Sequence, residues 1–142
     1  MTLGMPAEAS TGTAVVIDTS AIVGILRDEP DAAALIKRAI SFERRVMAAP
    51  TWLEAAIVCE SKNPSGRALF DRLVKQLRME VQPFTVAQAA IARKAYRKFG
   101  KGRGSKAQLS FGDCFSYALA KHLGAPLLFK GNDFGHTDVM PA

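Results

Sequence analysis

Short apolar runs alternate with amphipathic stretches along most of the chain. Residues 14–17 end in three consecutive β-branched side chains, which is typical of a short buried strand. Residues 45–49, 79–84 and 127–129 are further apolar runs of strand length. Between these runs, apolar side chains recur every three or four positions, which indicates helices. The helices predicted in this way span residues 21–27, 32–43, 52–61, 68–77, 86–99 and 109–123.

Stop signals separate these elements and fix the class of fold. The turn sequence Asn-Pro-Ser-Gly occupies residues 63–66, and Gly124 follows the last helix. Buried strands that alternate with helices favour a parallel sheet covered on both faces. We therefore predict a three-layer α/β/α sandwich with a mostly parallel central sheet. Residues 14–142 are expected to form one domain, and residues 1–13, rich in small and polar side chains, a frayed N-terminal extension.

Composition excludes several classes of protein. The chain of 142 residues has two cysteines and two histidines, which gives no CxxC pair, no disulfide framework and no His-rich zinc site. No apolar run approaches the roughly 20 residues of a membrane span, and the first residues do not form a secretory signal. We therefore expect a cytoplasmic protein with no membrane partner.

The positive charge of the chain is concentrated in one segment. Nineteen bases and thirteen acids give +6, yet residues 93–106 contain seven bases and no acid, so the remaining residues sum to −1. Such a segment suits the phosphate backbone of a nucleic acid. A solvated helix face followed by a loop is the commoner explanation of a charge run alone. The seven bases, referred to below as the basic segment, are Arg93, Lys94, Arg97, Lys98, Lys101, Arg103 and Lys106.

Four acids stand in apolar surroundings. Asp18 directly follows the first strand, and Asp133 follows the last strand by four residues. Glu54 and Asp113 lie within apolar helical stretches. An ionised carboxylate is costly to bury without a partner, and the carboxyl ends of parallel strands meet at one crevice. We therefore expect the four acids to converge on a divalent cation, and all-oxygen ligation favours Mg²⁺, with Mn²⁺ as a substitute.

Each acid also has a purely structural explanation. Asp18 can cap the helix that follows it, and Glu54 can be a first-turn acid favoured by the helix dipole. Asp113 can cap a shorter helix, and Asp133 can be a turn residue. Asp138 competes with Asp133 for the fourth position. These alternatives stay open at the level of the sequence.

Four segments carry a resemblance to a known family. They are Val-Ile-Asp-Thr-Ser-Ala at residues 16–21, Leu-Glu at 53–54, Leu-Ser-Phe-Gly-Asp-Cys-Phe-Ser-Tyr-Ala-Leu-Ala at 109–120, and Leu-Leu-Phe-Lys-Gly-Asn-Asp-Phe at 127–134. Together they resemble the PIN-domain family, and more narrowly the VapC ribonuclease toxins of bacterial toxin–antitoxin pairs. The resemblance runs from about residue 15 to residue 138. The Asp-Thr-Ser opening alone is common, whereas the Gly-Asp-Cys-Phe-Ser-Tyr-Ala block is specific.

The resemblance implies a role for each acid. Asp18 and Asp113 correspond to the principal metal ligands. Glu54 corresponds to the second family acid, which often reaches the metal through water, and Asp133 to the fourth and least consistent acid. Ser110 stands where many relatives have Asn, a departure that we expect to matter little.

The resemblance also implies an activity and its partners. The expected reaction is Mg²⁺-dependent hydrolysis of RNA phosphodiester bonds, in which a metal-bound water attacks and leaves 5′-phosphate and 3′-hydroxyl ends. A hydroxyl from Thr19 or Ser20 would support the metal or its water, and the basic segment would hold the RNA backbone. The implied assembly is a homodimer silenced by a cognate VapB-like antitoxin. The candidate contact side chains for these partners are Leu35, Ile36 and Ile40, although plain core packing is the commoner explanation for most of them.

Three other functions compete with this hypothesis. A protein with the same fold can bind RNA without cleaving it. An aspartyl phosphatase would use Asp18 as a nucleophile, but that class usually needs a second Asp two residues later, where this chain has Ser20. A nucleotide-binding loop at residues 100–106 misses the required glycine spacing and follows a helix rather than a strand.

Overall fold

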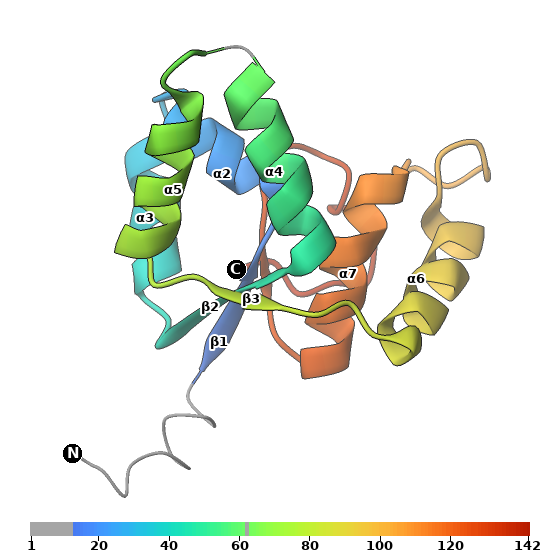
Figure 1. The fold of residues 1–142 in the computed structure, drawn as a ribbon. Helices are drawn as coiled ribbons and strands as arrows, with labels where there is room; N and C mark the ends of the chain where they lie inside the picture. The colour runs from blue at the N-terminus through green and yellow to red at the C-terminus, as the bar shows by residue number, and fades with distance from the viewer. Residues whose placement is uncertain (1–12, 62) are drawn as a thin grey trace, which may run out of the picture.

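A four-stranded parallel sheet forms the centre of the computed structural model, which describes residues 13–61 and 63–142 (Figure 1). The strand order is β3-β2-β1-β4, and every pairing is parallel. The strands are β1 (Ala14–Ile17), β2 (Arg44–Ala48), β3 (Glu80–Gln82) and β4 (Leu127–Leu128). The helices of the described residues are α2 (Thr19–Leu26), α3 (Ala32–Ile40), α4 (Ala49–Ser61), α5 (Gly66–Gln76), α6 (Val86–Phe99) and α7 (Phe111–Leu123).

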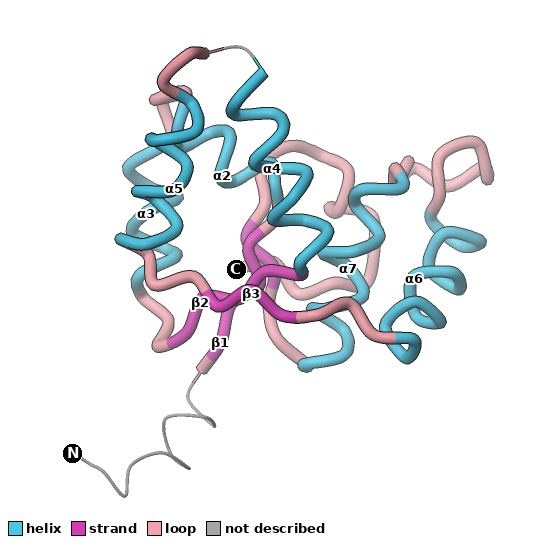
Figure 2. Tube along the Cα trace, in the orientation of Figure 1, coloured by secondary structure: helices cyan, strands magenta, loops and turns pink. Residues whose placement is uncertain are grey.

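Helices cover both faces of this sheet. Successive side chains of a strand point to opposite faces, and β1 follows this rule. Val15 and Ile17 join a buried apolar cluster with residues of α2, α3, α4 and α5. Val16 joins a second cluster with residues of α6, α7 and the C-terminal segment. The two helical layers lie on either side of the strands in Figure 2, which confirms the predicted three-layer α/β/α sandwich.

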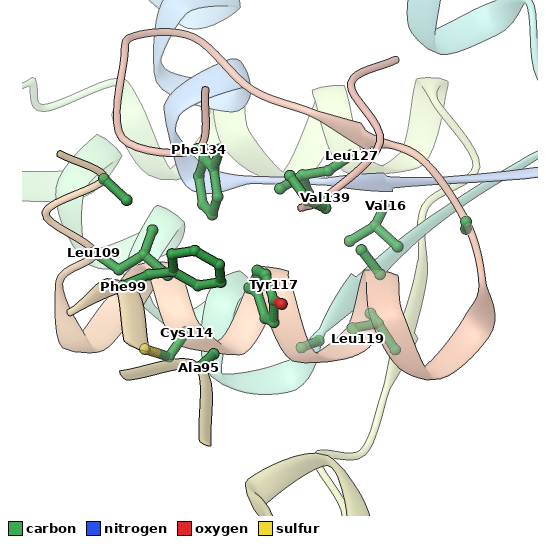
Figure 3. Close-up of a cluster of buried hydrophobic side chains, with 14 of the residues drawn as sticks. Val16, Ala95, Phe99, Leu109, Cys114, Tyr117, Leu119, Leu127, Phe134 and Val139 are labelled. Atoms are coloured by element: carbon green, nitrogen blue, oxygen red, sulfur yellow. The ribbon is translucent and has the colours of Figure 1, made fainter. Parts of the chain in front are cut away.

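The α6–α7 layer is closed by the C-terminal end of the chain. Phe99 of α6 lies 6.0 Å from Tyr117 of α7, measured between ring centroids. Phe134 and Val139 pack against the same cluster from the last loop (Figure 3). This packing holds α7, which carries Asp113, between the sheet and α6.

The predicted elements are all present, with shifted ends. The helix predicted from residue 52 begins at Ala49, because Pro50 is tolerated in the first turn of a helix. The strand predicted over residues 79–84 is reduced to Glu80–Gln82, just before Pro83. The last long helix begins at Phe111 rather than residue 109, because Ser110 caps it.

Most of the predicted N-terminal extension, residues 1–12, lies outside the described residues. Thr13 is described, and it pairs with the start of β2: its N–H donates to Glu43 Oε1 at 3.0 Å, and its carbonyl accepts the Arg44 N–H at 3.0 Å. None of the described helices is long and apolar enough to cross a membrane.

A close backbone approach fixes α5 against the end of α4, the helix that carries Glu54. A Cβ atom added at Gly66 would lie 1.9 Å from the Cys59 carbonyl oxygen. Since this oxygen belongs to the backbone, it cannot rotate away. We expect Gly66→Ala to lower the free energy of unfolding by about 1–3 kcal/mol, the usual cost of overpacking, as measured by urea denaturation.

Gly135 provides the matched control for this prediction. A Cβ atom there would lie 3.6 Å from the Asn132 carbonyl oxygen, an ordinary contact distance. Gly135→Ala should therefore stay within about 0.5 kcal/mol of the unmodified chain. Equal urea midpoints for the two variants would contradict the role of Gly66.

Candidate active site

Asp18 stands where β1 ends and α2 begins. Its extended backbone makes it the N-cap of α2, and its Oδ2 accepts hydrogen bonds from the Ser20 N–H at 3.0 Å and the Ser20 hydroxyl at 2.7 Å. Its Oδ1 accepts a hydrogen bond from the Ser116 hydroxyl at 2.5 Å, and Asp18 is only 3% exposed. The capping explanation and the buried-acid expectation therefore both hold for this residue.

Asp113 lies in the first turn of α7 in a capping box. The Ser110 N–H donates to Asp113 Oδ2 at 2.9 Å, and the Asp113 N–H donates to Ser110 Oγ at 3.2 Å. The pKa of Asp113 is raised to about 6, mainly by burial; the negative charges of Asp18 and Asp133 also raise it, and the Ser110 hydrogen bonds lower it. Asp113 thus lies within electrostatic reach of two other predicted site acids, and Ser110 acts as the N-cap.

Glu54 reaches the same place from α4. Its Oε1 accepts a hydrogen bond from Thr19 Oγ1 at 2.7 Å. A Cβ atom added at Gly112 would lie 2.4 Å from Glu54 Oε2, so the carboxylate rests against the helical turn that holds Asp113. The glycine beside Asp113 therefore leaves room for the second acid.

The expectation that Glu54 and Asp133 are buried is wrong, because both are exposed. The helix around Glu54 is not buried on all sides: Leu53 is 53% and Ile57 58% exposed on its outer face. The apolar surroundings in the sequence therefore do not correspond to burial in the fold. Only Asp18 is fully buried, and Asp113 is half-buried.

The structure separates Asp133 from its competitor Asp138. Asp133 follows β4, and its negative charge contributes to the raised pKa of Asp113. Asp138 accepts a hydrogen bond from the Tyr117 hydroxyl and forms an ion pair with Lys121 at 3.2 Å. These partners hold the pKa of Asp138 below its ordinary value, with Tyr117 the larger cause. Asp138 is thus neutralised away from the other acids.

The loop that carries Asp133 is tied to the start of α2 and to the connection between α2 and α3. The Lys130 N–H donates to Ser20 Oγ at 2.9 Å. The Lys130 ammonium forms ion pairs with Glu29 and, at 2.9 Å, with Asp31. Asp133 is therefore held near the acids of β1 and α7 through Lys130.

The four predicted site acids offer carboxylate oxygens as ligands and have no basic side chain as a partner among the described residues. In the part of the chain that the structure describes, none of them forms an ion pair with Lys, Arg or His. Within residues 13–61 and 63–142, no three Asp, Glu, His or Cys side chains are close enough to hold one metal ion directly. Within the described residues, the four acids therefore do not converge on one ion as direct ligands; a hard divalent cation, which their oxygen atoms suit, would need water to complete its coordination. The four are Asp18, Glu54, Asp113 and Asp133.

Hydroxyl groups bond to two of these acids, Asp18 and Glu54. Thr19 and Ser20, the predicted supporting hydroxyls, bond to Glu54 and Asp18, respectively. Two further hydroxyl residues, Ser116 and Thr51, were not predicted; the structure buries both completely. A signal for Ser116 existed: it lies three residues after Asp113, on the same side of α7, in an otherwise apolar run.

The basic segment covers the end of α6 and the loop that leads to α7, and all seven of its bases are exposed. Of the described residues, no acid forms an ion pair with any of them. The loop is pinned at its base, because the Lys101 N–H donates to the Leu109 carbonyl at 2.8 Å and the Leu109 N–H to the Phe99 carbonyl at 2.9 Å. Figure 1 shows α6 and this loop beside α7, the helix of Asp113.

Comparison with known proteins agrees with this architecture. A family model described as the PIN domain matches residues 15–140. VapC ribonuclease Mb0625 of Mycobacterium bovis is 47% identical over 129 residues, which cover 90% of this chain and 97% of the relative. Ribonuclease VapC of Mycolicibacterium smegmatis is 50% identical over 127 residues, which cover 88% of this chain and 97% of the relative.

Solved structures show the same fold. VapC20 of Mycobacterium tuberculosis, a "Sarcin-Ricin loop cleaving toxin", has a TM-score of 0.70 at 13% identity, over 90% of this chain and 98% of that one. A toxin–antitoxin complex from Klebsiella pneumoniae has a TM-score of 0.67 at 12% identity, over 90% and 96% of the two chains. The chain belongs to the PIN-domain family, in its VapC branch.

The raised pKa of Asp113 predicts a pH-dependent effect on stability. The unfolded side chain has an ordinary pKa of 3.8 and the folded one about 6, so the folded state is disfavoured when Asp113 ionises. Asn at this position stays neutral and can still accept the Ser110 N–H. We expect EDTA-treated Asp113→Asn to melt a few degrees higher than the unmodified chain at pH 7.5. The difference should shrink as the pH falls through 6 and vanish near pH 4; equal melting temperatures at pH 7.5 would contradict the prediction.

Proposed function

We propose that this protein is a metal-dependent endoribonuclease toxin that hydrolyses RNA phosphodiester bonds. The single observation that carries the proposal is the set of four acids without a basic partner, in a chain that also carries a segment of seven exposed bases. Relatives with 47–50% identity over nearly their whole length bear the name ribonuclease, which supports the same activity. An RNA-cleaving site of this kind needs both signs of charge: acids to bind the cation and bases to bind the RNA phosphates.

The residues of the site suit Mg²⁺ as the cofactor. Asp18 and Asp113 are the principal ligands in this proposal, and Glu54 and Asp133 act through water. A bound Mg²⁺ supplies positive charge and lowers the pKa of a coordinated water to the range where hydroxide forms. All four side chains donate oxygen, which Mg²⁺ prefers, and the carboxylates repel one another until a cation is present.

Each side chain has a task in the reaction. Asp113 must be ionised to bind a cation. Below about pH 6 its carboxyl is mostly protonated, so cation binding there has to displace this proton. Glu54, held by Thr19, orients the attacking water. The basic segment binds RNA phosphates outside the site and so positions the backbone, with little dependence on sequence.

The partners of this function follow from the family. We propose that a small antitoxin covers the site and that the toxin forms a homodimer. Of the candidate contact residues, Leu35 is 1% exposed and belongs to the core, whereas Ile40 is 59% exposed and available. The main competing function, RNA binding without cleavage, is separated by the following experiment.

Metal-dependent cleavage of RNA tests the proposal directly. We expect the purified protein to cleave total RNA with Mg²⁺ and to be inactive in EDTA. Asp18→Asn and Asp113→Asn should each lower the cleavage rate at least 100-fold, because each removes a principal ligand charge. Gel analysis of the RNA and end-labelling of the products provide the measurement.

Asp138→Asn is the matched control, since Asp138 is neutralised by Lys121 outside the acid group. It should retain cleavage close to that of the unmodified chain. Cleavage that persists in EDTA would contradict metal dependence, and RNA binding that never leads to cleavage would favour the non-catalytic alternative.

The salt dependence of RNA binding tests the basic segment. In the cleavage-deficient Asp113→Asn background, replacing Arg97, Lys98 and Lys101 by Ala should reduce the slope of log Kd against log salt by about 2, since each lost phosphate contact on a single strand removes about 0.7. A filter-binding titration at several salt concentrations measures this slope. As a control, replacing the exposed bases Lys37, Arg72 and Lys75 of α3 and α5 by Ala should leave the slope unchanged. Equal slopes for the two triple variants would remove the basic segment from the RNA interface.

A further inference from the structure

Ser116 is a completely buried hydroxyl in the middle of α7, and its exposed fraction is 0%. A serine inside a helix often bonds to the carbonyl of the preceding turn. Ser116 instead donates to Asp18 Oδ1 at 2.5 Å, across 98 positions of the chain. Since a buried hydroxyl is costly unless it is hydrogen-bonded, this contact fixes both Ser116 and the carboxylate that it binds.

A second buried hydroxyl supports the first. Thr51, in the first turn of α4, is also 0% exposed, and its Oγ1 lies 3.4 Å from Ser116 Oγ. A hydroxyl has one proton, and Ser116 gives its proton to Asp18, so Thr51 is the donor in this pair. The hydroxyls therefore form a directed chain from α4 through α7 to the end of β1.

The Asp18 carboxylate is held through both of its oxygens. Ser116 occupies one position on Oδ1, and the N–H and hydroxyl of Ser20 occupy Oδ2. Two-sided hydrogen bonding fixes the plane of the carboxylate. The two bonds from Ser20 occupy both lone-pair positions of Oδ2, whereas Oδ1 keeps one position free to ligate a further group. None of these donors is a lysine or arginine, so the negative charge is oriented without being neutralised.

We infer that Ser116, supported by Thr51, is the positioning residue that orients Asp18 for a divalent cation. This inference rests on the proposed function, because it concerns the cation site of the ribonuclease. Ser116 touches neither RNA nor the reacting water in this role and acts only through Asp18. Hydrogen-bond partners of metal ligands typically change metal affinity 10–100-fold when they are removed.

Mn²⁺ binding to the full-length chain tests the inference without RNA. We expect Ser116→Ala to raise the Kd for Mn²⁺ about 10–100-fold, measured by titration calorimetry and by the paramagnetic resonance signal of free Mn²⁺. Ser116→Thr keeps the hydroxyl and should restore the Kd to within a few-fold. If Ser116→Ala does not fold, Ser116→Cys replaces it, because its thiol is a much weaker donor in nearly the same volume.

Ala120→Gly is the control for a merely structural role. Ala120 is 1% exposed in the same helix and does not contact Asp18, so this variant should melt at a lower temperature yet bind Mn²⁺ normally. A folded Ser116→Ala that binds Mn²⁺ like the unmodified chain overturns the role of Ser116 while the proposed function stands. Failure of the unmodified chain to bind Mn²⁺ overturns the proposed cation site itself, and the inference falls with it.

Discussion

The buried negative charge at the end of β1 is the constraint on which the rest of this structure depends. Asp18 is 3% exposed, and an ionised carboxylate in such a position requires compensation. Most proteins would supply a lysine or an arginine. Here the compensation comes from one backbone N–H and two hydroxyls, of Ser20 and Ser116, which stabilise the charge but leave it negative. A carboxylate stabilised in this way keeps the negative charge that a cation would need.

The same principle extends outward to the other acids. Thr19 bonds to Glu54 as Ser20 bonds to Asp18, so two adjacent hydroxyls at the start of α2 serve two different carboxylates. Lysine does take part, but at a distance: Lys130 pairs with Glu29 and Asp31 and thereby fixes the loop of Asp133. The Lys130 ammonium thus stabilises the surrounding loops, whereas hydroxyl groups bond to the carboxylates of Asp18 and Glu54.

Much of this could be predicted from the sequence, because it is local. The run of β-branched residues before Asp18 defines a buried strand whatever the rest of the chain does, and the order of strands and helices then favours a parallel sheet. The specific Gly-Asp-Cys-Phe block around Asp113 identified the family. The resemblance preferred Asp133 over Asp138, but the ion pair of Asp138 with Lys121 is a long-range contact that spacing in a loop does not reveal.

The long-range features could not be predicted in this way. Ser116 and Asp18 are 98 positions apart, and no periodicity connects them. The exposure of Glu54 escaped prediction for the opposite reason: its neighbours Leu53 and Ile57 are apolar, yet α4 turns them outward. Apolar character predicts burial on average, but which side of a helix faces the core depends on its packing partners.

The position of the four acids along the chain has a consequence for synthesis. Asp18 lies near the start of the chain and Asp133 near its end, and β4, which pairs directly with β1, comprises residues 127 and 128. A nascent chain still inside the ribosome therefore lacks the strand that completes the sheet beside β1. The acids can therefore assemble only after β4 and Asp133 have left the ribosome, so the site stays incomplete while the residues before them are being made.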